Sequence, residues 1–235
     1  MKAVSRTHIG NVRASNQDAL LVQEGDFGVY AVADGMGGHK AGDVASQMAI
    51  AIVGERLKGL RPTAGALKKG IEEANRKIYD QQLTNRDLSG MGTTMTALWE
   101  DQKRILLGHV GDSRAYRVRG GEMDQLSQDH SMVGELVRQG VLTPEEAQRH
   151  PYRNIITRAL GAESTVDVDI MDLAKLPGDI YLICSDGLYE YIQDEEMKRI
   201  LLSQPMNQAA DTLLSLALHR GGQDNISLVI GEVDR

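Results

Sequence analysis

The stretch YAVADGMGGHKAGD, residues 30–43, places a carboxylate directly after an apolar run and follows it with several glycines. A lone carboxylate at the edge of a core is costly unless a cation or hydrogen-bond donors meet it. A glycine at position 35 allows a backbone carbonyl to approach a neighbouring group closely. We therefore expect Asp34 and a main-chain oxygen to point at one position.

Four more aspartates stand at the ends of apolar runs. Asp186 follows YLICS and Asp112 follows ILLGHVG, while Asp224 precedes ISLVIGEV and Asp18 precedes ALLV. Any one of them could be structural, because aspartate is favoured in turns and helix caps. If these strand ends converge, however, the like charges would repel strongly unless bound cations neutralise them.

The candidate ligands are all oxygen atoms. No cluster of His and Cys has zinc spacing, and Cys184 is the only cysteine. Carboxylates and carbonyls select hard cations, which favours magnesium or manganese and leaves calcium possible, although the EF-hand pattern is absent. Two such metals roughly 3.5–4 Å apart would activate a water and hold a phosphoryl oxygen.

Other catalytic motifs do not fit the sequence. A Walker loop needs GK[ST] after its glycines, but Gly38 is followed by His39. A dinucleotide motif starting at Gly35 would have Lys40 in its sixth position, where glycine is required. Cys184 lacks the arginine of a cysteine phosphatase and is expected to be a small buried hydrophobe. No GxSxG elbow is present.

Composition limits the class of protein that carries these residues. The 235 residues, 41% hydrophobic and 25% charged, can form a sizeable core, and the net charge of −7 argues against nucleic-acid binding. No apolar run approaches the roughly 20 residues that span a bilayer, and the N-terminus lacks the apolar core of a secretory signal. With one cysteine no internal disulfide can form. We expect a cytoplasmic protein that binds neither nucleic acid nor membrane.

The elements that must position the aspartates form blocks of strands between pairs of helices. Strands are predicted over residues 1–7, 19–23, 27–33, 93–99, 105–110, 115–119, 122–126, 165–171, 179–185 and 226–233. Helices are predicted from Asp43, from about Thr63, after the capping box at Thr143, and over 194–203 and 207–219. The Gly120-Gly121 pair predicts a two-residue hairpin. This order, without a linker, predicts one α+β domain over residues 1–235, built as a layered sandwich.

The motifs, taken in order, resemble the type 2C metal-dependent serine/threonine protein phosphatases, and their bacterial stand-alone members in particular. They run from near the start to near the end of the chain: VRASNQD (12–18), VADGMGGHKAGD (32–43), SGMGTT (89–94), GHVGDSRAY (108–116), QDHS (128–131), ITRALG (156–161), CSDGL (184–188) and GGQDNIS (221–227). The resemblance implies a four-layer α-β-β-α sandwich, two antiparallel sheets packed face to face with helix pairs outside.

The resemblance also assigns metal ligands to positions of this sequence. By this similarity, Asp34 bridges two divalent metals, and the carbonyl of Gly35 serves the second. Asp224 and Asp186 hold the first, partly through water. Asp112 and Asp186 form a third metal site, as often seen in bacterial members. The implied cofactor is Mn²⁺ or Mg²⁺, two per active site with a possible third.

Further residues receive catalytic roles by the same similarity. Arg13 corresponds to the arginine that grips the substrate phosphate, a task suited to its planar fork of donors. Asp18 would act as an acid beside the metals. The eukaryotic branch has a histidine where Met36 stands, so His39 is the candidate leaving-group acid, with an ordering role in the glycine loop as the alternative. The same branch has a glutamate where Gln17 stands, and the loss of that charge would weaken binding of the second metal in this protein.

The resemblance implies a phosphatase for phosphoserine and phosphothreonine in proteins. Metal-bound water would attack phosphorus directly, without a phosphoenzyme. The implied partners are phosphorylated proteins and a cognate serine/threonine kinase whose products the enzyme reverses, and the enzyme is expected to be a monomer. The alternatives are a phosphatase dedicated to one regulatory partner and a non-catalytic phosphoprotein-binding module on the same scaffold, since substrate choice lies in loops.

A basic stretch offers one further hypothesis. Arg138, Arg149, His150, Arg153 and Arg158 lie close together in an otherwise acidic protein. In the family this region forms a flap beside the active site, where it could attract phosphorylated, acidic peptides. The alternative is an ordinary solvated surface.

Overall fold

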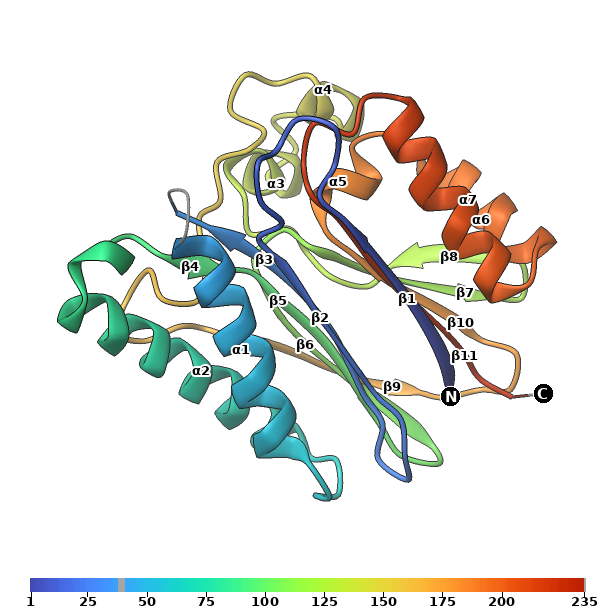
Figure 1. The fold of residues 1–235 in the computed structure, drawn as a ribbon. Helices are drawn as coiled ribbons and strands as arrows, with labels where there is room; N and C mark the ends of the chain where they lie inside the picture. The colour runs from blue at the N-terminus through green and yellow to red at the C-terminus, as the bar shows by residue number, and fades with distance from the viewer. Residues whose placement is uncertain (38–40, 235) are drawn as a thin grey trace.

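Two antiparallel sheets form the centre of the molecule (Figure 1). The computed structural model describes residues 1–37 and 41–234. The first sheet contains, in spatial order, β1 (Lys2–His8), β11 (Ile226–Glu232), β10 (Ile180–Cys184), β7 (Arg114–Arg119) and β8 (Glu122–Gln125). The second contains β2 (Asp18–Gln23), β3 (Val29–Met36), β5 (Met95–Glu100), β6 (Arg104–Val110) and β9 (Asp169–Ala174), and the short β4 (Gly92–Thr93) pairs with β3.

Helix pairs cover the outer faces of both sheets (Figure 1). The second sheet is covered by α1 (Ala41–Leu57) and α2 (Ala64–Thr84), and the first by α6 (Asp194–Ser203) and α7 (Met206–His219). Shorter helices complete the fold: a 3₁₀ turn at Arg86–Leu88, α3 (Met132–Arg138), α4 (Pro144–Gln148) and α5 (Asp186–Tyr189). The arrangement confirms the predicted four-layer sandwich.

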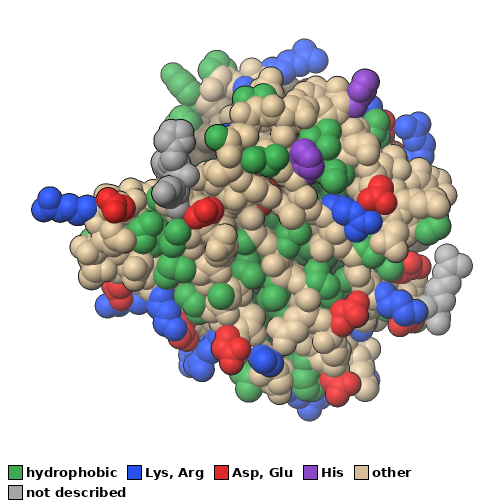
Figure 2. Space-filling view, viewed as in Figure 1, with side chains coloured by type: hydrophobic (Ala, Val, Ile, Leu, Met, Phe, Trp, Pro, Cys, Tyr) green, Lys and Arg blue, Asp and Glu red, His purple; other side chains and the backbone are tan. Residues whose placement is uncertain are grey.

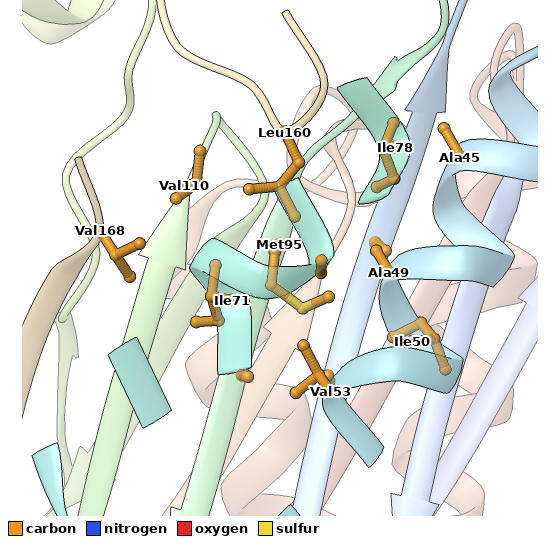
Figure 3. Packing of buried hydrophobic residues seen from close by; sticks show 14 of the residues in the cluster. Ala45, Ala49, Ile50, Val53, Ile71, Ile78, Met95, Val110, Leu160 and Val168 are labelled. Atoms are coloured by element: carbon orange, nitrogen blue, oxygen red, sulfur yellow. The ribbon is translucent and has the colours of Figure 1, made fainter. Parts of the chain in front are cut away.

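Three apolar layers hold these four layers together. One lies between the second sheet and its helices, where Ala49 and Val53 of α1 meet Ile71 of α2 and Met95 of β5 (Figure 3). A second layer joins the first sheet to α6 and α7, and the third fills the space between the sheets. Since packing of apolar surface supplies most of the folding free energy, this double-sided core makes both sheets rigid supports for their loops.

Several predicted elements are confirmed by the structure. Thr63 caps α2, and Leu67, Ile71, Ala74 and Ile78 all face the core with no exposed surface. The capping box at Thr143 begins α4. Gly120 and Gly121, both with positive φ, connect β7 to β8. The α6 prediction matches the helix observed at Asp194–Ser203.

Other predictions were wrong in detail. The structure places Asp43 inside the first turn of α1 rather than at its cap, and the predicted face of Val44, Met48 and Ile52 is only partly buried. Small residues such as Ala45 and Ala49 form the buried face instead, because they let the helix approach the sheet closely. Strand β9 (Asp169–Ala174) overlaps the predicted range 165–171 but begins four residues later, and α3 and α5 were not predicted.

Charged side chains of both signs are interspersed over the face of the molecule in Figure 2. Among the described residues, no helix combines the length and the apolar character needed to cross a bilayer.

Candidate active site

Asp34 lies near the end of β3, directly opposite Asp18 of β2 in the antiparallel register. Its backbone is fixed by two threonines, Thr93 at the end of β4 and Thr94 directly after it. The amide of Asp34 donates to Thr94 Oγ1 at 2.9 Å, and its carbonyl accepts from the Thr94 amide at 2.8 Å and from Thr93 Oγ1 at 2.8 Å. The carboxylate therefore projects from a backbone position that cannot rotate freely.

Gly35 continues this strand at a point where no side chain would fit. An added Cβ would meet the carbonyl oxygens of Gly42 and Gln17. The Gly35 amide donates to the Gln17 carbonyl at 3.1 Å. The glycine thus allows α1 and the loop before β2 to close around the end of β3, as the sequence predicted for a close approach of backbone.

Asp112 and Asp186 come from the loops at one end of the first sheet. Asp112 lies between β6 and β7, and Asp186 is the first residue of α5, directly after β10. A hydroxyl pair, Thr94 Oγ1 and Ser113 Oγ at 2.8 Å, joins the loop of Asp112 to the threonine that holds Asp34. Short contacts thus link two of the predicted ligands, Asp34 and Asp112.

Asp224 lies just before β11, beside the loop that carries Arg13. The guanidinium Nη2 of Arg13 donates to Asp224 Oδ2 at 2.5 Å. Asn225 fixes this loop: its side-chain amide donates to the carbonyls of Ile9 and Ser15, and its Oδ1 accepts from the Gln17 amide. Figure 1 shows the loop after β1 running beside the segment that enters β11.

The carboxyl groups of this cluster repel one another. Burial raises the pKa of Asp34 well above its usual range, and the charges of Asp18, Asp186, Asp112 and Asp224 raise it further. Burial, followed by the charges of Asp112 and Asp224, likewise raises the pKa of Asp186 well above the usual range. Burial also raises the pKa of Asp112 to about 7. The structure therefore places these carboxyl groups close enough for their charges to disfavour one another's ionisation.

Asp18 belongs to the same cluster but has hydrogen-bond partners of its own. Burial raises its pKa to about 6, while hydrogen bonds from Ser227 and Ser185 oppose that increase. The Ser185 hydroxyl donates to Asp18 Oδ2 at 2.9 Å. Asp18 is thereby tied to the segment that leads into Asp186.

The donor set fits divalent metal ions. Within residues 1–37 and 41–234, the buried atoms Asp18 Oδ1 and Asp186 Oδ1 have no hydrogen-bond partner, although a buried carboxylate oxygen normally has one. In the described part of the chain, no three acidic, His or Cys side chains are already gathered closely enough to hold a metal. The charges of these carboxyl groups nevertheless raise one another's pKa, which requires the groups to lie near one another. A divalent cation bound among them would quench their repulsion.

Some functional residues were not found from the sequence. Thr94 was expected only as part of the strand predicted over residues 93–99, yet it connects the end of β3 at Asp34 to the loop of Asp112. Asn225 organises the Arg13 loop, and its position directly after Asp224 in GGQDN was the available signal. His39, the candidate leaving-group acid, lies outside the described residues.

The basic stretch is partly used within the protein. Arg138 donates to the carbonyl of Asp129, and Arg158 pairs with Asp169. Arg153 lies 3.6 Å from Glu190, at the end of α5. These contacts place the segment that carries Arg153 beside the aspartate cluster, but they reduce the number of positive charges available to a peptide.

Comparison with known proteins gives the same family along nearly the whole chain. The family model described as protein phosphatase 2C matches residues 6–224. The serine/threonine phosphatase Stp of Listeria monocytogenes is 38% identical over 243 aligned residues, covering 100% of this chain and 96% of that protein.

Solved structures share the fold at similar identity. The crystal structure of the Mycobacterium tuberculosis serine/threonine phosphatase PstP/Ppp superposes with a TM-score of 0.92 at 38% identity, covering 100% of this chain and 99% of that one. The catalytic domain of PstP in complex with two manganese ions gives a TM-score of 0.88 at 36% identity, covering 100% and 98%.

Proposed function

Because this chain belongs to the protein phosphatase 2C family, we propose that its aspartate cluster is the active site and that Arg13 binds the substrate phosphate there. The chain is a metal-dependent serine/threonine protein phosphatase, and Mn²⁺ or Mg²⁺ is its cofactor. The site assignment rests mainly on the closeness of Asp34, Asp112, Asp186 and Asp224. The charges of the last three raise the pKa of Asp34, and the charges of Asp112 and Asp224 raise the pKa of Asp186.

The proposed ligands are Asp34 and the Gly35 carbonyl, together with Asp186, Asp224 and, for a third ion, Asp112. Divalent metals bound there supply positive charge that favours ionisation of a water molecule and stabilises a transferring phosphoryl group. We include Asp18 because it lies opposite Asp34 and is fixed by Ser185, so that its charge is placed beside these ligands.

Arg13 is proposed to orient the phosphate. Its side chain is exposed, and the hydrogen bond to Asp224 raises the pKa of Arg13, outweighing the opposite effect of burial on that pKa. The charges of Asp186 and Asp34 raise it further, so the guanidinium lies within the field of the cluster. A planar fork of donors at this place can bind two phosphate oxygens at once.

Phosphate release from a phosphothreonine peptide tests the assignment. With Mn²⁺ the protein should release phosphate, and chelation should abolish the release. The Asp34→Asn variant should be inactive with Mn²⁺, whereas Asp26→Asn, an exposed hairpin change, should retain activity. Binding of the peptide without release at any metal concentration would favour the phosphoprotein-binding module. Release from one regulatory phosphoprotein but from no peptide would favour a dedicated phosphatase.

The biological setting is proposed on chemical grounds. A serine/threonine kinase must supply the substrates, because such kinases make the phosphoesters that this enzyme hydrolyses. We propose a cytoplasmic monomer, since the single buried cysteine provides no disulfide and one chain contributes every proposed ligand. We also propose that residues 1–235 act as one catalytic domain, because an apolar layer joins the two sheets.

A further inference from the structure

The helix α5 contributes to the aspartate cluster at both of its ends. Its first residue is Asp186, and its last residue, Tyr189, donates a hydrogen bond from its hydroxyl to the carbonyl of Asp112 at 3.0 Å. One short helix thus carries one carboxylate and the group that holds the backbone of another.

The ring of Tyr189 is fixed independently of its hydroxyl. The guanidinium carbon of Arg114 lies 3.7 Å from the ring centroid, in a cation–π contact. Arg114 is itself held by Asp129, which accepts from Nε at 3.0 and 3.1 Å and from Nη2 at 2.7 Å. The phenol is therefore aimed at Asp112 by a rigid, charged support.

The position of α5 is also fixed. An added Cβ at Gly187 would meet the carbonyl oxygen of Asn225, so the helix lies in direct contact with the backbone before β11. The Glu190 amide donates to the Asp186 carbonyl at 3.0 Å and closes the helix. The distance between Asp186 and the Tyr189 hydroxyl is consequently set by a single rigid turn.

The other contacts of the Asp112 loop lead away from α5. Ser113 bonds to Thr94, and Gly111 exchanges two hydrogen bonds with His130, at 2.8 and 3.0 Å. Within the described residues, the hydrogen bond from the Tyr189 hydroxyl links this loop to α5.

We propose that Tyr189 is a positioning residue whose hydroxyl sets the separation of Asp112 and Asp186, and thereby the affinity for the metal ion that these two aspartates share. This inference rests on the proposed assignment of Asp112 and Asp186 as ligands of a third ion. The simpler role, stacking on Arg114, does not require the hydroxyl.

Calorimetric titration of metal-stripped protein with Mn²⁺ tests the proposal. The relevant binding step is the one that disappears in Asp112→Asn. Tyr189→Phe keeps the stacked ring and removes only the hydroxyl, and it should raise the Kd of that step about fivefold, the worth of one hydrogen bond. The remaining Mn²⁺ steps should keep their wild-type Kd, and the Mn²⁺ concentration for half-maximal phosphate release should rise by a similar factor.

Tyr116→Phe is the matched control. Its hydroxyl accepts from Arg114 Nη1 at 3.2 Å rather than bonding to the Asp112 backbone, so this variant disturbs the same arginine without the proposed link. It should retain the wild-type Kd. Thermal unfolding of each stripped variant shows whether the fold is intact.

The outcomes separate this inference from the site assignment. A wild-type Kd in Tyr189→Phe, or an equal loss in Tyr116→Phe, overturns the role of Tyr189 while leaving Asp112 as a ligand. If Asp112→Asn keeps every Mn²⁺ step, the assignment of Asp112 is wrong and the role of Tyr189 is overturned with it, even if Mn²⁺-dependent phosphatase activity persists.

Discussion

The Asp34 carboxylate destabilises the fold when no metal is bound, but it is proposed to be needed for activity. Burial disfavours the ionised form of its carboxyl group, and the charges of Asp18, Asp186, Asp112 and Asp224 disfavour it further. The fold without metal therefore contains electrostatic repulsion that a hydrophobic core of this size can tolerate. Such a site is the expected structure of a metal centre, because the repulsion becomes attraction when cations bind.

Replacing Asp34 with Asn should have opposite effects on stability and turnover. In EDTA, loss of the repulsion should stabilise the fold by at least about 1 kcal/mol, which corresponds to a Tm rise of about 2–4 °C for a chain of this size. With Mn²⁺, phosphate release should fall by at least about a hundredfold because a proposed metal ligand is lost. Differential scanning calorimetry and a phosphopeptide assay measure the two effects. A lower Tm in EDTA would show that Asp34 contributes favourable contacts instead.

Arg13→Lys should test the geometry of phosphate binding. Lysine keeps the charge but not the planar fork of donors. The kcat/KM for a phosphothreonine peptide should fall about tenfold or more, with the titrated number of Mn²⁺ ions unchanged. Full activity in Arg13→Lys would mean that the guanidinium only neutralises Asp224.

The aspartates could be predicted from the sequence, whereas their supports could not. Each aspartate is marked locally by an apolar run and a neighbouring small or polar residue. Thr94 and Tyr189 carry no such mark, because their hydroxyls act on backbone far away in the chain: Tyr189 holds Asp112, and Thr94 holds Asp34. Contacts of that kind are set by the tertiary fold.

Among the elements, the short helix α5 depends on a glycine. Gly187→Ala should force the helix away from Asn225, since the new Cβ would overlap a carbonyl oxygen. We expect a destabilisation of about 2 kcal/mol or more and weaker Mn²⁺ binding. Gly65→Ala is the matched control in α2, where nothing lies within 4 Å of the added Cβ. It should stabilise by about 0.5–1 kcal/mol, as alanine is the better helix former. Urea unfolding compares the variants, and equal effects would refute the packing argument.

Strand β6 buries a histidine that stays neutral. His109 Nε2 donates to the Gln128 carbonyl at 3.0 Å, and Nδ1 lies 2.9 Å from Thr96 Oγ1. Burial, with a smaller effect of His130, lowers the pKa of His109 to about 4. The unfolded chain binds this proton below pH 6.5 and the folded chain does not, so the stability that depends on neutral His109 is lost as the pH falls from 6.5 to 4.

Comparison with His109→Gln isolates this effect. The variant cannot titrate, while the aspartates contribute equally to both proteins. The difference in free energy of unfolding between the wild type and His109→Gln should decrease by about 3 kcal/mol as the pH falls from 6.5 to 4. Urea unfolding in EDTA at several pH values measures the difference, and a constant gap would indicate that His109 is protonated in the folded state.

Helices and strands could be predicted where their own sequence sets their limits. The α2 face and the Thr143 capping box follow from local spacing. The buried face of α1 does not, because the helix is apolar nearly all round and the sheet selects its small residues. Helices as short as α5, with four residues, have no periodic pattern to detect and exist through tertiary contacts.

At the scale of the whole molecule, the site joins the two sheets. Asp34 belongs to the second sheet, while Asp186 and Asp224 flank strands β10 and β11 of the first. Asp112 lies on the connection between them, from β6 to β7. Metal ions held by these residues would therefore connect the two halves of the sandwich across their shared apolar layer.

Metal binding should accordingly stabilise the molecule as one cooperative unit. At a Mn²⁺ concentration of about 100 times Kd, one site adds about 2.7 kcal/mol, or about 5–10 °C in Tm. The unfolding should remain a single transition with and without Mn²⁺, because the layer between the sheets couples them even without metal. Calorimetry of wild type, Asp26→Asn and Asp34→Asn measures this, and only Asp34→Asn should lose most of the shift. Two separate transitions, with Mn²⁺ moving one of them alone, would mean that the sheets unfold independently and that residues 1–235 are not one domain.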